Sequence, residues 1–190
     1  MKFRKIFLFE IRYQLRRPST WIYFVAIVGV ISLMTGEIAD DSRNGESIKL
    51  TSPFMLAELA GYANKFGFIL IAALAADGVM RDIQSRMDSL IYTSSVSKFA
   101  YLGARFAASL FIACILLVIS VPLSLVISQF TQDLEPVLFG DFRFSAFIDS
   151  ALFLIIPNVF VATSLMYAIV SFTGSAVAAY GGGMLLLFFS

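Results

Sequence analysis

The sequence predicts an all-α protein, a polytopic bundle of transmembrane helices with about five spans. Of its 190 residues, 59% are hydrophobic and only 14% are charged. Soluble domains average roughly 45–50% apolar and about 25% charged residues, so this chain has too few charges for a water-facing surface. Its mean hydropathy is +0.86, and its apolar residues gather in runs long enough for membrane-spanning helices.

A helix needs about 20 predominantly apolar residues to cross a hydrocarbon core of roughly 30 Å. Five segments of this kind are expected, at 19–35, 56–79, 101–128, 145–172 and from about 175 onward. The first is slightly short, and Ser19 or Thr20 is expected to cap it after Pro18. The fifth reaches Ser190 without a polar flank. We therefore expect 18–190 to be a transmembrane permease domain that continues beyond this residue.

Residues 1–17 form a second predicted unit, an amphipathic elbow helix. Apolar side chains recur every four residues on one face, at Phe3, Phe7, Ile11 and Leu15. Basic side chains gather on another face, at Lys5, Arg12 and Arg16. Pro18 disfavours helical geometry at Arg17 and so predicts a break before the first span. The segment is expected to lie on the cytoplasmic face, as an anchor to anionic lipid or as a contact for a soluble partner.

The distribution of Lys and Arg predicts the orientation. Basic residues concentrate before the first span and between the second and third, at Lys2, Arg4, Lys5, Arg12, Arg16, Arg17, Arg81, Arg86, Lys98 and Arg105. The alternate loops hold only Arg43, Lys49 and Arg143, among several acids. The positive-inside rule then places the amino terminus in the cytoplasm, in a multi-pass protein of the cell (inner) membrane. The net charge of +1 indicates no nucleic-acid partner.

The segment between the second and third spans has the most specific pattern. Charged residues alternate with apolar ones, Arg81, Asp82, Arg86 and Asp88 against Ile83, Met87, Leu90 and Ile91. This alternation is typical of a short helix lying across a membrane face. A solvated loop is the alternative.

Two parts of the chain resemble ABC-2 type transporter permeases. Arg81-Asp82 after a span, then LIYTSSVSK (90–98) and YLGARF (101–106), resembles their cytoplasmic loop. The opening FEIRYQLRRPSTWIYF (9–24) resembles their amino-terminal elbow. The closer resemblance is to bacterial permeases of this type that carry an M1-class aminopeptidase-like domain after the permease.

This resemblance implies a dimer or pseudo-dimer that works with a separate cytoplasmic ATPase subunit. The loop 80–98 would be the coupling helix that docks on the ATPase, with Arg81, Asp82, Arg86, Asp88, Leu90, Tyr92 and Lys98 as the coupling residues. Any aminopeptidase chemistry would lie beyond Ser190. The alternative function is a membrane anchor for such an enzyme domain, without transport.

The chain lacks the motifs of the common catalytic sites. It has no G-x-x-x-x-G-K-[ST] loop to hold ATP phosphates, so ATP-driven work would come from another subunit. It has no His, which excludes an H-E-x-x-H zinc site and Ser-His catalysis within these residues. We therefore expect no enzyme activity in this segment and assign no catalytic, cofactor-binding or metal-binding residue.

Two features inside the predicted spans have both a functional and a structural interpretation. Glu58 and Lys65 share one helix face near the outer end of the second span, where a mid-bilayer charge costs at least about 2.5–3.5 kcal/mol. They are either residues of a transport pathway or interfacial side chains, with Lys65 extending outward.

In the fifth span, small residues recur every four positions, at Gly174, Ala178 and Gly182 and at Ser175, Ala179 and Gly183. They predict close helix packing, in a dimer or within the chain.

Overall fold

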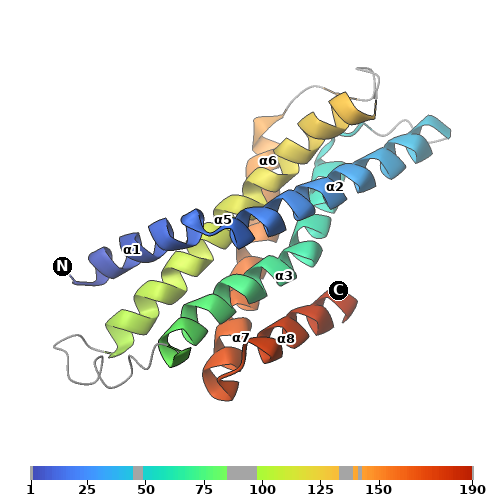
Figure 1. The fold of residues 1–190 in the computed structure, drawn as a ribbon. Helices are drawn as coiled ribbons and strands as arrows, with labels where there is room; N and C mark the ends of the chain where they lie inside the picture. Colours follow the sequence, from blue (N-terminus) through green and yellow to red (C-terminus); the bar gives the residue numbers. More distant parts are fainter. Residues whose placement is uncertain (1, 45–48, 85–97, 133–138, 141–142, 190) are drawn as a thin grey trace.

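The computed structural model describes residues 2–44, 49–84, 98–132, 139–140 and 143–189. The described chain is all-α (Figure 1). Its helices are α1 (Lys2–Arg16), α2 (Pro18–Asn44), α3 (Pro53–Gln84), α5 (Lys98–Thr131), α6 (Phe144–Ser150), the π-helical turn η2 (Ala151–Ile155), α7 (Ile156–Thr173) and α8 (Ala176–Phe189). At one end of the bundle, α3 and α7 end and α5 and α8 begin. We call this end the junction end.

Four helical segments are long and apolar enough to cross a membrane: Pro18–Ala39, Pro53–Arg81, Phe99–Thr131 and Phe144–Thr173. They confirm the first four predicted spans, and the first is longer than expected, at 22 residues. The predicted fifth span corresponds to α8, which has 14 residues. This is fewer than the roughly 20 that a full crossing needs, so the described part of the chain supports four spans.

Helix α3 is the central element of the bundle. It packs against α2, α5, α7 and α8, and it is the most buried of the four spans. Small residues on several of its faces make this possible. A Cβ added at Gly67 would lie 2.6 Å from a methyl carbon of Leu117 in α5. Gly67 therefore lets α5 approach α3 closely.

The small residues near the carboxyl end of the chain have two different roles, which are helix packing and the ending of a helix. Ala179 is fully buried, and a Cβ added at Gly183 would lie 3.1 Å from the Cβ of Ala72 in α3. Gly174, in contrast, has φ 60° and accepts the left-handed conformation that ends α7. Of the two packing roles that the sequence left open, the structure shows the contact within the chain for Ala179 and Gly183.

The predicted break between the elbow and the first span occurs at Arg17, between α1 and α2. The expected cap at Ser19 or Thr20 is wrong, because α2 already begins at Pro18. The Thr20 hydroxyl instead donates backward to the carbonyl of Gln14, at 2.9 Å, and the Trp21 indole donates to the carbonyl of Leu15, at 2.7 Å. These bonds satisfy carbonyl groups that the end of α1 would otherwise leave unpaired.

The fourth span is interrupted by a π-helical turn. Residues Ala151–Ile155 have π geometry, and Pro157 follows within the first turn of α7. Asn64 of α3 donates its side-chain N–H to the carbonyl of Leu154, at 3.1 Å. A side-chain donor at this point compensates for irregular backbone in a membrane-spanning helix.

Candidate functional site

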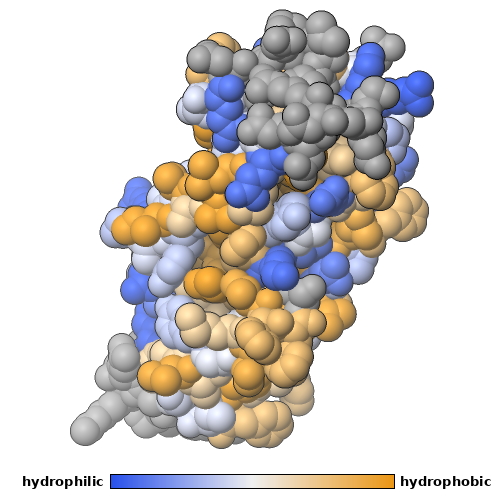
Figure 2. All heavy atoms as spheres, turned by 90° about the vertical axis from the view of Figure 1, so that its right-hand side faces the viewer, coloured by the Kyte–Doolittle hydropathy of each residue, from blue (hydrophilic) through white to orange (hydrophobic). Residues whose placement is uncertain are grey.

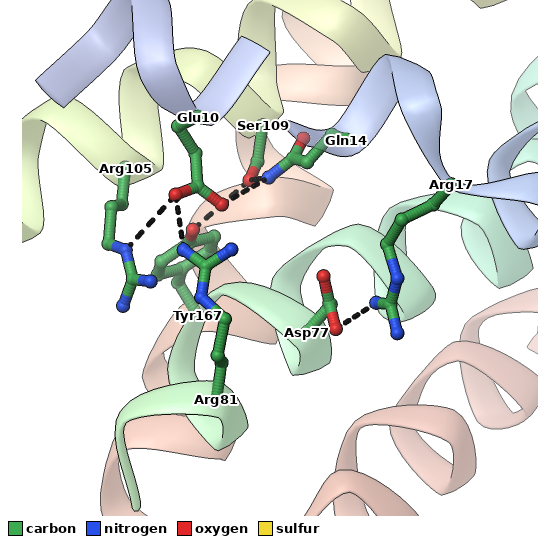
Figure 3. Close-up of polar contacts among 8 residues, drawn as sticks. All are labelled: Glu10, Gln14, Arg17, Asp77, Arg81, Arg105, Ser109 and Tyr167. Atoms are coloured by element: carbon green, nitrogen blue, oxygen red, sulfur yellow. Dashed lines mark hydrogen bonds and ion pairs between the residues drawn. The ribbon is translucent and has the colours of Figure 1, made fainter. Parts of the chain in front are cut away.

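A buried carboxylate connects three helices at the junction end. Glu10 of α1 is 1% exposed, and its Oε2 lies 2.5 Å from Arg81 Nη2 of α3 and 3.3 Å from Arg105 Nε of α5 (Figure 3). Gln14 donates its amide N–H to the other carboxylate oxygen, at 3.2 Å. Both oxygens of Glu10 therefore have donors, as a buried charge requires.

The network continues from Gln14 into the fourth span. The amide of Gln14 also donates to the Ser109 hydroxyl of α5, at 2.9 Å. The Ser109 hydroxyl lies 3.1 Å from the hydroxyl of Tyr167 in α7. A Cβ added at Gly78 of α3 would lie 2.5 Å from the same Tyr167 oxygen, so only glycine leaves room for it. We call Glu10, Gln14, Arg81, Arg105, Ser109 and Tyr167 the Glu10 junction.

Aromatic rings cover the two arginines of the Glu10 junction. The guanidinium carbon of Arg81 lies 4.1 Å from the centre of the Tyr13 ring. That of Arg105 lies 4.9 Å from the centre of the Tyr101 ring. Rings at these distances attract the cation through their π faces and shield it from solvent. The junction thus combines ion pairing with apolar cover.

A second ion pair lies at the rim of the junction. Arg17, in the break between α1 and α2, pairs with Asp77 of α3 (Figure 3). The side chain of Arg17 is 40% exposed, whereas that of Arg105 is 4% exposed. Solvent therefore screens the Arg17–Asp77 pair far more than the pairs of Glu10.

The packed face of α1 is only partly its predicted apolar face. Phe7 contacts Phe111 of α5, with ring centroids 6.0 Å apart, and Ile11 packs against the core. Phe3 and Leu15 are exposed, and Glu10 and Gln14 are buried instead. The predicted basic residues Lys5, Arg12 and Arg16 are exposed on the opposite side. Buried polar residues are tolerated on the packed face because α3 and α5 supply their partners.

The predicted coupling residues are only partly within the described chain. Arg81 belongs to the Glu10 junction. Asp82 and Lys98 lie in the last turn of α3 and at the start of α5, and their side chains are not among those described. Arg86, Asp88, Leu90 and Tyr92 lie outside the described residues. The structure therefore places the ends of the helices that flank this segment but not the segment itself.

Sequence reasoning did not single out Glu10, Gln14, Ser109 or Tyr167. A signal was present, because Glu10 is the only acid among the first 17 residues. An isolated acid on a basic amphipathic helix is best explained by cations on a neighbouring element. Its partners lie 71 and 95 residues away in the chain, and no local pattern connects them.

Comparisons with protein-family models, with curated proteins and with solved structures find no match for this chain. A functional assignment therefore depends on the geometry of the junction and on the motifs of the sequence. The chain is an all-α protein whose four apolar helices are those of a multi-pass membrane protein.

The two charges predicted inside the second span both lie in α3. Glu58 and Lys65 are half-buried, five and twelve residues after Pro53. They do not form an ion pair with each other or with any other described residue. Lys65 therefore differs from Glu10, Arg81 and Arg105, which form ion pairs between helices.

Proposed function

We propose that this chain is the membrane-spanning permease portion of an ABC-2 type transporter that is driven by a separate cytoplasmic ATPase. The observation that supports it best is the Glu10 junction. Through Glu10, α1 is connected to the end of α3 and to the first turns of α5. These two helices flank the segment 85–97, in which the sequence resembles a coupling helix.

The junction provides a way to transmit a displacement. Force applied to the segment between α3 and α5 would move Arg81 and Arg105, and the shared carboxylate would carry α1 with them. Tyr167 and Ser109 extend the connection to α7. For ATP to drive such a movement, the ATPase must bind two membrane states with different affinity.

The junction also changes the role expected for Arg81. Its guanidinium is held by Glu10 and covered by Tyr13, so we assign it a positioning role within the permease. The direct contacts with the ATPase are then expected from the residues that follow it, principally Arg86, Asp88 and Tyr92. Charge reversal at Arg81 would disturb the fold as well as the contact, so it is a poor test of docking.

The docking test uses the tagged full-length protein purified from its native membranes, with mass spectrometry of co-purifying proteins and an ATPase assay. Combined Arg86→Glu and Asp88→Arg substitutions should remove a stoichiometric ATPase while membrane insertion is retained. The matched control is Arg143→Glu, an exposed charge at the start of α6, at the opposite end of the bundle. Recovery of wild-type protein without any ATPase would contradict the proposal and favour a membrane anchor for an enzyme domain.

The proposed orientation places the junction end and α1 in the cytoplasm. It is tested by single cysteines in a Cys114→Ser background. Arg12→Cys and Lys49→Cys both introduce a thiol at an exposed position. A membrane-impermeant maleimide should label Lys49→Cys in intact cells and Arg12→Cys only after permeabilisation. The reverse pattern would invert the topology and separate the coupling segment from any cytoplasmic ATPase.

A further inference from the structure

The fourth span consists of two halves that meet at an irregular turn. We call α6 and η2 its distal half, because they lie away from the junction end. The N–H of Ile156 donates to the carbonyl of Ala151, five residues back, as in a π-helix. Pro157 then has no N–H to donate to the carbonyl of Phe153. Helices bend at π turns and at prolines, so the distal half can change its direction relative to α7.

A side chain of α3 stabilises this turn. Asn64 is 6% exposed and donates its amide N–H to the carbonyl of Leu154 in η2, at 3.1 Å. Apolar side chains form much of the surface on the side of the bundle that Figure 2 shows. In lipid, water does not reach backbone groups that an irregular turn leaves unpaired, so the protein must supply their partners. Asn64 is such a partner, and it favours the geometry that the turn has in this structure.

An apolar cleft of about 240 Å³ separates the distal half from α5. Val118 and Pro122 belong to its wall on α5, and Phe147, Ile148 and Ala151 belong to its wall on the distal half. On another side, α6 and η2 pack against α3. Within the described part of the chain, the space into which the distal half can move therefore lies toward α5.

The wall on α5 also contains a helix interruption. Pro122 lies inside α5 and has no N–H to donate to the carbonyl of Val118. Both walls of the cleft thus contain a point at which a helix can bend. None of the residues of the Glu10 junction lines the cleft. The cleft can therefore change its width while the contacts at the junction end are kept.

We propose that the distal half of the fourth span is a lid that closes toward α5, with η2 as its hinge and Asn64 as the residue that holds it open. Closure brings the apolar side chains of the two walls into van der Waals contact, the interaction that associates helices in a membrane. The hydrogen bond of Asn64 opposes closure. Loss of either contribution shifts the populations of the two states. The lid does not depend on an ATPase, and in the proposed permease it lies at the end opposite the coupling segment.

The experiment measures the distance between nitroxide labels on α5 and α6 by electron paramagnetic resonance, with the full-length protein in lipid nanodiscs. The labels are attached at Gln129→Cys and Ser145→Cys in a background that lacks other cysteines, including Cys114. Gln129 and Ser145 are exposed and do not line the cleft. The closed lid should appear as a population at shorter distance.

Asn64→Leu tests the residue that holds the lid open. It should raise the population at shorter distance about two- to twelvefold, the change in an equilibrium that the loss of one hydrogen bond produces. Asn158→Leu is the matched control, because Asn158 is an exposed amide of the same span without a hydrogen-bond partner among the described residues. Equal distance distributions for Asn64→Leu and Asn158→Leu would overturn the proposal.

Ala151→Phe tests the cleft and leaves the hydrogen bond of Asn64 in place. Its ring should occupy the space into which the lid closes and so remove the population at shorter distance. Leu152→Phe is the control, since Leu152 is the next residue of the same turn and is exposed outside the cleft. If these two variants gave the same distribution, the movement would not use the cleft and the proposal would fail.

A distance that no variant changes would mean that the cleft is filled, by lipid or by another part of the full-length protein, and would also overturn the lid. These outcomes are separate from that of the ATPase co-purification. An ATPase that co-purifies with a protein whose distance is fixed would leave the transporter standing and remove the lid. A lid that closes in a protein without an ATPase would be retained, although the protein would not be an ABC permease.

Discussion

The Glu10 junction and Lys65 are two solutions to the same problem of a charge in an apolar environment. Glu10 is 1% exposed and is held by two arginines and an amide. Lys65 is half-buried beside open space and forms no ion pair with a described residue. Glu10 therefore has its counter-charges within the described chain, whereas Lys65 has none there.

This difference shows which charges fix the positions of the helices and which do not. A carboxylate shared between helices fixes their relative positions, because each partner would be costly to bury without it. A lone ammonium in a span fixes nothing and costs stability. The junction therefore accounts for how α1, α3 and α5 are held together, and Lys65 contributes no ion pair to this within the described chain.

The largest effect is expected from Glu10→Ala. Removal of the carboxylate that Arg81 and Arg105 share should lower the free energy of unfolding by about 3–5 kcal/mol, as for other buried pairs that lose one member. The measurement is unfolding in mixed micelles titrated with SDS. Glu37→Ala is the control, because Glu37 is an exposed acid in α2, and it should change stability by less than about 0.5 kcal/mol. Equal effects of the two substitutions would mean that the junction does not hold the bundle.

Lys65→Met should have the opposite sign. Without lipid, replacing the ammonium by an apolar side chain of similar length should raise stability, by up to about 2.5–3.5 kcal/mol. The same unfolding titration in a neutral detergent measures it. Destabilisation by Lys65→Met in neutral detergent would show that Lys65 already has a partner, and the contrast with Glu10 would fail.

A smaller loss is expected from Tyr167→Phe. It removes the hydroxyl that contacts Ser109 and should cost about 0.5–1.5 kcal/mol, the usual net value of one hydrogen bond. Tyr62→Phe is the control, since Tyr62 is half-buried in α3 and its hydroxyl has no partner among the described residues. A loss as large as that of Glu10→Ala would show that α7 belongs to the centre of the junction rather than to its periphery.

The smallest effect is expected from Arg17→Ala. The pair of Arg17 with Asp77 is partly exposed, and exposed ion pairs contribute about 0–1 kcal/mol. The effect should also shrink as salt is added, because solvent-exposed charges are screened. Comparison of the unfolding titrations at low and high salt measures this. A loss that does not depend on salt would place Arg17 with the buried charges instead.

The local features of the fold were predictable from the sequence. The four spans follow from apolar length, and the break at Arg17 follows from Pro18. The span limits were less accurate, since α2 begins at Pro18 and continues well past the predicted end at Thr35. A helix can continue past its apolar segment, because its hydrogen bonds are internal and do not depend on hydropathy.

The partners of each charge were decided only by the tertiary structure. From the sequence, the positive charges of Arg81 and Arg105 predicted only that both lie on the cytoplasmic side of the membrane. The sequence gave no role to Glu10. Which cations meet that carboxylate depends on which helices become neighbours, and helix packing is set by side-chain shape across the whole bundle. The same holds for Gly183. The sequence predicted close helix packing there, but only the tertiary structure shows that the helix it contacts is α3. The sequence by itself thus determined which four segments are long and apolar enough to cross a membrane, since hydropathy is a sum over neighbouring residues. Only the tertiary structure decided which of the described charges are paired, since pairing depends on distances between residues far apart in the chain.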